Sequence, residues 1–83
     1  MANAHNILES DRKPASAGIL ASIRFARRHG LSVGCRVRLG GIAGIVIGYN
    51  IARNGPYPGT AFPLLVRTEL GTGKFAVAEV TAI

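Results

Sequence analysis

The stretch that decides the expected fold spans residues 33–51 and reads VGCRVRLGGIAGIVIGYNI. In its first part Cys35, Val37 and Leu39 are separated by arginines, so apolar and charged side chains alternate. An alternation of period two is typical of a strand with one face on the core and the other in solvent. We therefore expect a strand that buries its apolar side chains and points a pair of arginines outward.

The second part of the stretch predicts a longer strand. Gly40 and Gly41 can turn the chain, and residues 42–51 are rich in β-branched side chains. Gly44 and Gly48 interrupt this run, and a glycine inside a strand commonly marks a bulge or a sharp bend. Both strands are therefore expected to belong to a tightly coiled sheet.

Turn-forming residues and short apolar runs continue to alternate downstream. Residues 52–61 contain two Pro-Gly-rich clusters and predict a loop. Gly71 and Gly73 are expected to frame a tight turn, and the remaining strands are expected at residues 62–68, 74–77 and 80–83. Short strands joined by Gly-rich turns indicate a small closed barrel, because closure removes exposed strand edges.

The candidate core residues are Val37, Leu39, Ile45, Ile47, Leu65, Val66, Phe75 and Val77. Of the neighbours Leu65 and Val66, only one can face inward unless a bulge intervenes.

Residues 14–30 predict an amphipathic, basic helix ahead of the barrel. Pro14 suits a first helical turn, and Gly30 suits the left-handed residue that ends many helices. Leu31 follows this stop and is expected to pack back on Ala26. The packed stripe of the helix comprises Ile19, Ile23 and Ala26, with Leu20 at its edge.

The chain is expected to form one domain with a small core. At 83 residues, it can bury only about 60–65% of the surface that its unfolded form exposes. The expected organisation is a flexible tail over residues 1–13, the helix over 14–30 and the barrel over 33–83. A core of this size leaves little volume for a cofactor, and none is predicted.

The cysteine count and the hydropathy pattern point to a soluble protein of the cytoplasm. Cys35 is the only cysteine, so no internal disulfide is expected and a reducing compartment is the simplest location. The first ten residues lack the pattern of a secretory signal. No run approaches the roughly 20 apolar residues that a membrane-spanning helix needs, so no membrane partner is predicted.

Charge gives the clearest functional signal. Ten basic residues stand against four acidic ones, which gives a net charge of +6 and favours an anionic partner. Arginine dominates, and its planar fork of donors suits phosphate and carboxylate groups. A GC-rich coding bias and a merely solvated charged face are the alternative interpretations. From residue 12 to residue 53 the chain has no acid, and its basic residues are Arg12, Lys13, Arg24, Arg27, Arg28, Arg36, Arg38 and Arg53. Downstream of this run, Arg67 and Lys74 balance Glu69 and Glu79.

Phe25 falls outside the packed stripe of the predicted helix, among small side chains. Either the barrel covers this face as well, or Phe25 belongs to an exposed surface on which a protein partner docks. The arginines are expected to form a continuous positive surface beside it. The candidate partner-binding residues are Arg24, Phe25, Arg27, Arg28, Arg36, Arg38 and Arg53.

Catalytic, metal and nucleotide sites are not predicted. His5 lies in the tail, His29 at the end of the helix and Cys35 on an inward strand position, so a nucleophile with a base and an orienting group is not assembled. A Cys35–His29 pair is conceivable, but an isolated cysteine on an apolar face is usually a small core residue. The histidines, the cysteine and the acids have no recognised ligand spacing, and the glycines do not gather before a helix to cradle phosphates.

Residues 33–38 (VGCRVR) followed by 44–49 (GIVIGY) resemble the opening of SH3-like barrels of the KOW kind, which occur in ribosomal proteins and transcription elongation factors. Cys35 stands where those modules carry Asp, and their basic-aromatic loop is shortened here to residues 40–43. The resemblance covers about the last fifty residues and implies a five-stranded SH3-like barrel. It implies little about activity, because one small barrel can serve many functions.

The same segment looks like the plasmid-borne type II dihydrofolate reductases, short SH3-like chains that assemble as tetramers around a pore. Their pore-lining Val-Gln-Ile-Tyr tetrapeptide falls on residues 72–75, which read TGKF. The Gln and Tyr are missing, so this resemblance implies the barrel and argues against the enzyme. A basic helix joined to a minimal barrel also looks like short phage-encoded regulators of host RNA polymerase.

These observations lead us to expect a non-enzymatic regulator that docks on the transcription machinery, on RNA polymerase, on nucleic acid or on both. The alternatives are an oligomeric reductase of the type II dihydrofolate reductase kind and a ribosome-associated or general RNA-binding module. The oligomeric state is left open. The reductase would require a tetramer, so molecular mass in solution separates it from the other two.

Overall fold

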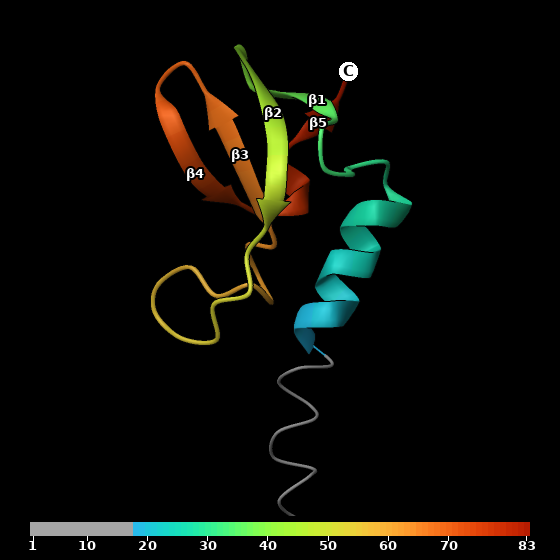
Figure 1. The fold of residues 1–83 in the computed structure, drawn as a ribbon, viewed down its shortest axis with the longest axis vertical. Helices are drawn as coiled ribbons and strands as arrows, with labels where there is room; N and C mark the ends of the chain where they lie inside the picture. The colour runs from blue at the N-terminus through green and yellow to red at the C-terminus, as the bar shows by residue number, and fades with distance from the viewer. Residues whose placement is uncertain (1–17) are drawn as a thin grey trace, which may run out of the picture.

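The protein is mainly β with one helix, as the sequence predicts. The computed structural model describes residues 18–83, in which one helix precedes a five-stranded antiparallel sheet with the strand order β4-β3-β2-β1-β5 (Figure 1). Consecutive strands are neighbours, except that the last strand returns to pair with the first. The strands are β1 (Arg36–Leu39), β2 (Ile42–Tyr49), β3 (Leu64–Thr68), β4 (Gly71–Phe75) and β5 (Thr81–Ala82).

The sheet is not closed into a barrel, so the prediction of a closed five-stranded barrel is wrong on this point. β4 and β5 stand at the two ends of the strand order, and β5 pairs with β1 through only two residues. Between them the chain forms a short 3-10 helix, η1 (Val77–Glu79), in which the Glu79 carboxylate accepts a hydrogen bond from the Ala76 N–H at 2.8 Å. Because Val77 enters this turn, the strand expected at residues 74–77 stops at Phe75.

The turn before β4 also differs from the prediction. Gly71 and Gly73 belong to β4 itself, and the turn is made by Glu69 and Leu70. The Thr68 hydroxyl accepts a hydrogen bond from the Leu70 N–H at 3.0 Å, which stabilises the turn. Gly71 has a φ of 120°, a conformation that side chains oppose, so glycine is needed at the first position of the strand.

The helix covers residues 18–28 of the described chain and ends as predicted. Gly30 has a φ of 81°, and its N–H donates to the Arg27 carbonyl at 3.0 Å. The Leu31 N–H donates to the Ala26 carbonyl at 3.0 Å, which completes the hydrogen-bond pair of a glycine-terminated helix. The predicted apolar contact accompanies it, since Leu31 and Ala26 belong to one buried cluster. Residues 14–17 of the predicted helix and the predicted tail lie outside the described residues.

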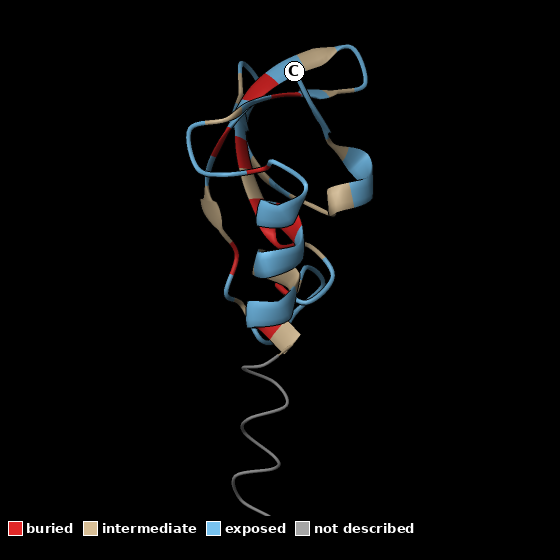
Figure 2. Cartoon of the chain, turned by 90° about the vertical axis from the view of Figure 1, so that its right-hand side faces the viewer, coloured by how far each residue is buried: buried red, intermediate tan, exposed pale blue. Residues whose placement is uncertain are grey.

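One stripe of the helix faces the sheet and the remainder faces solvent (Figure 2). Ile19 and Ala26 are buried and Ile23 is half-buried, as the periodicity predicts. Leu20, expected at the edge of the packed stripe, is 49% exposed.

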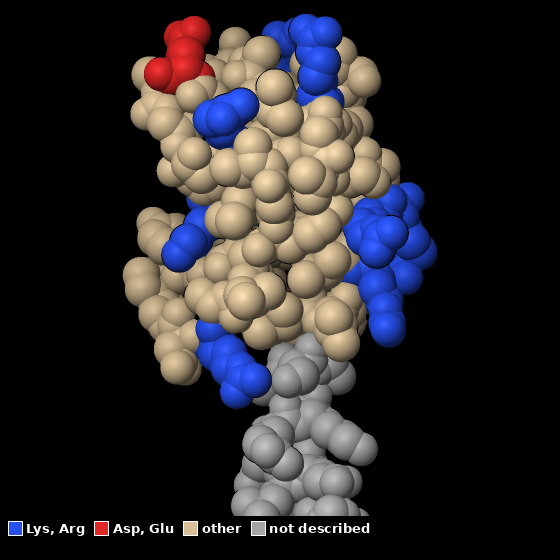
Figure 3. Space-filling model, viewed as in Figure 1, with Lys and Arg blue, Asp and Glu red and all other residues tan. Residues whose placement is uncertain are grey.

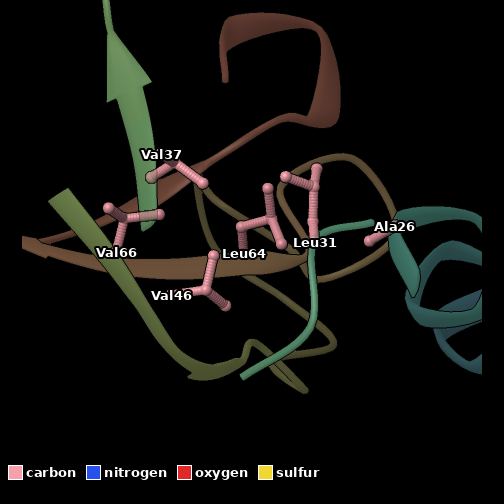
Figure 4. Packing of buried hydrophobic residues seen from close by; sticks show 6 residues of the cluster. All are labelled: Ala26, Leu31, Val37, Val46, Leu64 and Val66. Atoms are coloured by element: carbon pink, nitrogen blue, oxygen red, sulfur yellow. The ribbon is translucent and has the colours of Figure 1, made fainter. Parts of the chain in front are cut away.

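The core lies between the helix end and the inner face of the sheet, where its side chains point toward one another (Figure 4). Val37 and Val66 are fully buried as predicted, while Leu39, Phe75 and Val77 are only partly buried against this cluster. Its fully or almost fully buried members are Ala26, Leu31, Val37, Val46, Leu64 and Val66.

The face of β2 that points inward is the opposite of the one expected. Val46 is fully buried, whereas Ile45 and Ile47 are 37% and 39% exposed, so the prediction of Ile45 and Ile47 as core residues is wrong. Gly44 explains the choice, because an added Cβ there would lie 2.7 Å from Val66 Cγ1. Only a glycine lets β2 approach β3 this closely on the inner face.

A bulge in β2 confirms the distortion that its glycines predict. Val46 pairs with Val66 and Gly48 pairs with Leu65, so Ile47 is the extra residue between them. On β3 the buried side chains are Val66 and Leu64, and Leu65 is only half-buried. Val66 is therefore the inward member of the neighbouring pair, and the prediction of Leu65 as a full core residue is wrong.

The long loop between β2 and β3 is present as predicted, and one buried polar side chain organises it. Asn50 is only 4% exposed, and its amide nitrogen donates to the carbonyls of Tyr57 at 2.8 Å and Phe62 at 3.0 Å. Its side-chain oxygen accepts from the Ala52 N–H at 3.0 Å. The backbone of Gly59 packs so closely on Asn50 that any side chain there would collide with it. These contacts hold the loop against the end of the sheet.

Candidate partner-binding surfaces

Three of the predicted arginines form one cluster on the helix. Arg24, Arg27 and Arg28 are all exposed and, with Ser32, line a shallow hollow. We call these three residues the helix arginine cluster. In the space-filling view the largest group of basic side chains lies over the helix, on the right (Figure 3). The helical repeat places them together because positions one turn apart share a face.

The helix arginine cluster is suited to an oxyanion. Among residues 18–83 no carboxylate lines its hollow, and each guanidinium presents several donors in a rigid fork that matches phosphate or carboxylate. The cluster lies in the last two turns of the helix, where cations are favoured by the helix dipole. Three exposed guanidinium groups around one hollow can therefore hold one or more anionic groups of a partner.

Figure 3 shows further basic side chains away from the group over the helix, separated from it by uncharged surface. Arg36 and Arg38 are exposed on β1, and Arg53 is exposed in the long loop. Arg36 lines a separate hollow with Arg67, a residue that was not among the candidates. The described surface thus carries several separate basic patches rather than one continuous positive surface.

Phe25 lies at the border of a groove between the helix, the long loop and η1. Its side chain is 45% exposed, and its ring is stacked at a tilt on His29, with the centroids 4.2 Å apart. The loop approaches the same side of the helix, since the Ser22 hydroxyl donates to the Thr60 carbonyl at 2.8 Å. The Phe25 side chain is thus partly buried and partly exposed to solvent. The groove is lined by Ala21, Ser22, Phe25, Thr60, Ala61, Pro63, Val77 and Ala78.

The outer face of the sheet carries functional candidates that the sequence prediction missed. Ile45 pairs with Arg36 on one side and with Arg67 on the other, so these three side chains form a row across β1, β2 and β3. All three are exposed and line one hollow, with Glu69 at the β3–β4 turn also on its wall. We call Arg36, Ile45 and Arg67 the sheet row. Arginine is enriched at protein interfaces, so the sheet row is a candidate contact surface.

A further hollow lies along β4, at the position that resembles the reductase tetrapeptide. Lys74 and Phe75 line it together with Tyr57 and Phe62, whose rings meet edge to face with the centroids 5.2 Å apart. A side chain at position 73 would collide with the ring of Phe75, because a Cβ added to Gly73 would lie 2.9 Å from that ring. The hollow is aromatic, and Lys74 and Glu79 are the ionisable residues on its wall apart from Tyr57.

The residues considered for catalysis make contacts of other kinds. His29 Nδ1 lies 2.9 Å from the Phe25 carbonyl oxygen, and the Cys35 thiol donates to the Arg36 carbonyl at 3.4 Å. Among residues 18–83 there is no group of three or more metal-ligating side chains. His5 lies outside the described residues. In the same part of the chain, no helix has the length and apolar character needed to cross a membrane.

Comparisons of the chain with protein-family models, with curated proteins and with solved structures give no match. We therefore infer the function from the chemistry of the described surfaces.

Proposed function

We propose that this protein is a non-enzymatic binding protein that docks on the transcription machinery, with RNA polymerase and its bound nucleic acid as the partner. The observation that carries the proposal is the helix arginine cluster, in which Arg24, Arg27 and Arg28 are exposed around one hollow that no carboxylate of the described chain lines. Such a cluster attracts and holds phosphate or carboxylate groups. A partner of this kind would place the protein in the cytoplasm.

Exposed apolar side chains on the helix support a protein contact beside the anionic one. Phe25 and Leu20 are about half exposed on the same helix that carries the arginines. Aromatic and arginine side chains are the residues that most often dominate the affinity of protein interfaces. The helix therefore offers apolar and cationic groups together, a combination that suits a protein–nucleic acid complex better than bare nucleic acid.

The reductase is the weaker alternative. Residues 72–75 line the hollow on β4 as Thr, Gly, Lys and Phe, so this segment lacks both the Gln and the Tyr of the resembled pore tetrapeptide. A general RNA-binding module also has less support, because the outer sheet face presents an isoleucine between its arginines rather than an aromatic platform for bases.

Co-purification from the cells that encode the protein tests the proposal. Tagged wild-type protein and a variant with Arg24, Arg27 and Arg28 changed to Ala are captured in parallel, and the bound proteins are identified by mass spectrometry. A third variant, with the same residues changed to Lys, keeps the charge and serves as the matched control. We expect RNA polymerase subunits with the wild type and the Lys variant, and a strong loss with the Ala variant. Equal recovery by all three, or no polymerase with the wild type, would contradict the proposal.

A further inference from the structure

The outer face of the sheet is a second interaction surface, separate from the helix arginine cluster. The helix end packs on the inner face, where Ala26 joins Val37 and Val46, so it leaves the opposite face uncovered. On that face Arg36 pairs with Ile45, and Ile45 pairs with Arg67. Side chains of directly opposed residues lie on the same face of a sheet. The sheet row is therefore an exposed line of cation, aliphatic group and cation that crosses three strands.

The distance between the two arginines of the sheet row follows from the spacing of neighbouring strands. Neighbouring strands lie about 4.8 Å apart, so the backbone positions of Arg36 and Arg67 are separated by roughly 9.6 Å with Ile45 halfway. In an α-helix, residues seven positions apart are about 10.5 Å apart along the axis and share a face, and positions three and four fall between them. Such a helix with acids at its first and eighth positions could therefore place one acid at Arg36 and the other at Arg67. An aliphatic residue between the two acids would then meet Ile45.

The charge of this face selects an acidic partner. Arg38 lies two residues from Arg36 on β1 and pairs with Ala43, which also lines the hollow, so it adds a third cation on the same face. Glu69 is the carboxylate on the wall of the hollow, at its β3–β4 end. Cations therefore outnumber it on the surface that a partner would meet.

Ile45 distinguishes a protein partner from nucleic acid. Its side chain is 37% exposed between two guanidinium groups. A phosphate backbone would gain nothing from an aliphatic group at this point and would lose water on contact with it. An amphipathic helix, in contrast, buries its own aliphatic residue against Ile45 while its acids meet Arg36 and Arg67.

From this geometry we propose that the sheet row binds an acidic amphipathic helix of a partner protein, lying across the strands with acids at positions i and i+7 and an aliphatic residue at i+3 or i+4. The helix arginine cluster takes no part in this contact. The surface is thus independent of the function proposed above.

The test uses the full chain and a synthetic helical peptide with Glu at positions i and i+7 and Leu at i+3 and i+4. A scrambled peptide of the same composition is the control for bulk charge, and binding is followed by fluorescence anisotropy. We expect the designed peptide to bind about tenfold more tightly than the scrambled one, a ratio that an anisotropy titration resolves readily. No binding, or equal binding of both peptides, would overturn the proposal.

Substitution of Ile45→Lys gives the sharpest discrimination. It adds positive charge but removes the aliphatic contact, so we expect the designed peptide to bind several-fold more weakly. Tighter peptide binding by this variant would refute the proposed contact, and so would nucleic acid binding that depends on Arg36 and Arg67. If Ile45→Lys fails to fold, as judged by circular dichroism, the double variant Arg36→Ala/Arg67→Ala replaces it and must also lose peptide binding.

Two further variants complete the design. Glu69→Gln removes the carboxylate from the hollow and should strengthen peptide binding, since it would otherwise repel an acidic partner. The helix variant with Arg24, Arg27 and Arg28 changed to Ala should bind the peptide within about twofold of wild type, because exposed charges outside the contact contribute little to affinity at moderate salt. A large loss in the helix variant would show that the peptide binds the helix arginine cluster and would overturn the assignment to the sheet.

Discussion

Replacement of Asn50 by Ala should destabilise the protein strongly. The Asn50 side chain is buried and makes three hydrogen bonds to the backbone, at Ala52, Tyr57 and Phe62. A typical intramolecular hydrogen bond contributes about 1 kcal/mol, and a buried group left without a partner adds a further penalty. We therefore expect the free energy of unfolding to fall by about 3 kcal/mol, from a total of roughly 4–12 kcal/mol for a chain of this size.

Thermal and urea unfolding of the wild type and the variant measure this loss. For a domain of 60–100 residues, 3 kcal/mol corresponds to a fall in Tm of about 12–24 °C. Asn54→Ala is the matched control, because Asn54 lies in the same loop but is exposed, and it should change stability by less than about 0.5 kcal/mol. A loss below about 1 kcal/mol for Asn50→Ala would refute the conclusion that this amide organises the loop.

Three further predictions concern the sheet and the absence of enzymatic activity. Val46→Ala should cost about 2 kcal/mol in urea unfolding, whereas Ile45→Ala should cost less than about 1 kcal/mol; the reverse order would show that β2 faces the other way. Gly44→Ala should cost about 1–3 kcal/mol, because its Cβ would press on Val66 and on the Arg67 carbonyl, and a variant as stable as wild type would contradict this close approach. Purified protein should not oxidise NADPH with dihydrofolate in a spectrophotometric assay, and turnover that is lost on changing Lys74 or Phe75 would revive the reductase alternative.

The helix and its end could be predicted from the sequence because their determinants are local. The helical stripe of Ile19, Ile23 and Ala26 and the stop at Gly30 depend on neighbours within a turn or two. The same holds for the alternating strand at Arg36–Leu39, where charged residues leave only one possible inner face.

The inner face of β2 could not be predicted because both of its faces are apolar. In residues 42–49 the sequence IAGIVIGY offers Ile45 and Ile47 on one face and Val46 on the other, so a period of two does not choose between them. The choice depends on the close contact of Gly44 with β3, which is distant in sequence. Closure of the barrel is also a nonlocal property, and here η1 occupies the segment between the two edge strands.

The exposure of the arginines and the grouping of those on the helix could be predicted, but the sheet row could not. The arginines of the helix meet because the helical repeat brings them together. In the sequence Arg67 stands two residues from the acid Glu69, outside the acid-free run of basic residues, whereas the strand pairing places Arg67 across β2 from Arg36. The sheet row therefore appears only once the register of three strands is known.

The salt dependence of binding tests the central claim most directly. Affinity for RNA polymerase bound to a DNA duplex, and for the duplex alone, is measured over a series of KCl concentrations with the wild type and with the variant that has Arg24, Arg27 and Arg28 changed to Ala. If the cluster contacts phosphates, the variant should flatten the slope of log K against log salt by roughly 2–3 units, as expected for three lost contacts. If it meets an acidic protein surface, the loss should appear mainly in the association rate. The account would be contradicted if the variant bound both targets with the same affinity, the same salt slope and the same association rate as the wild type.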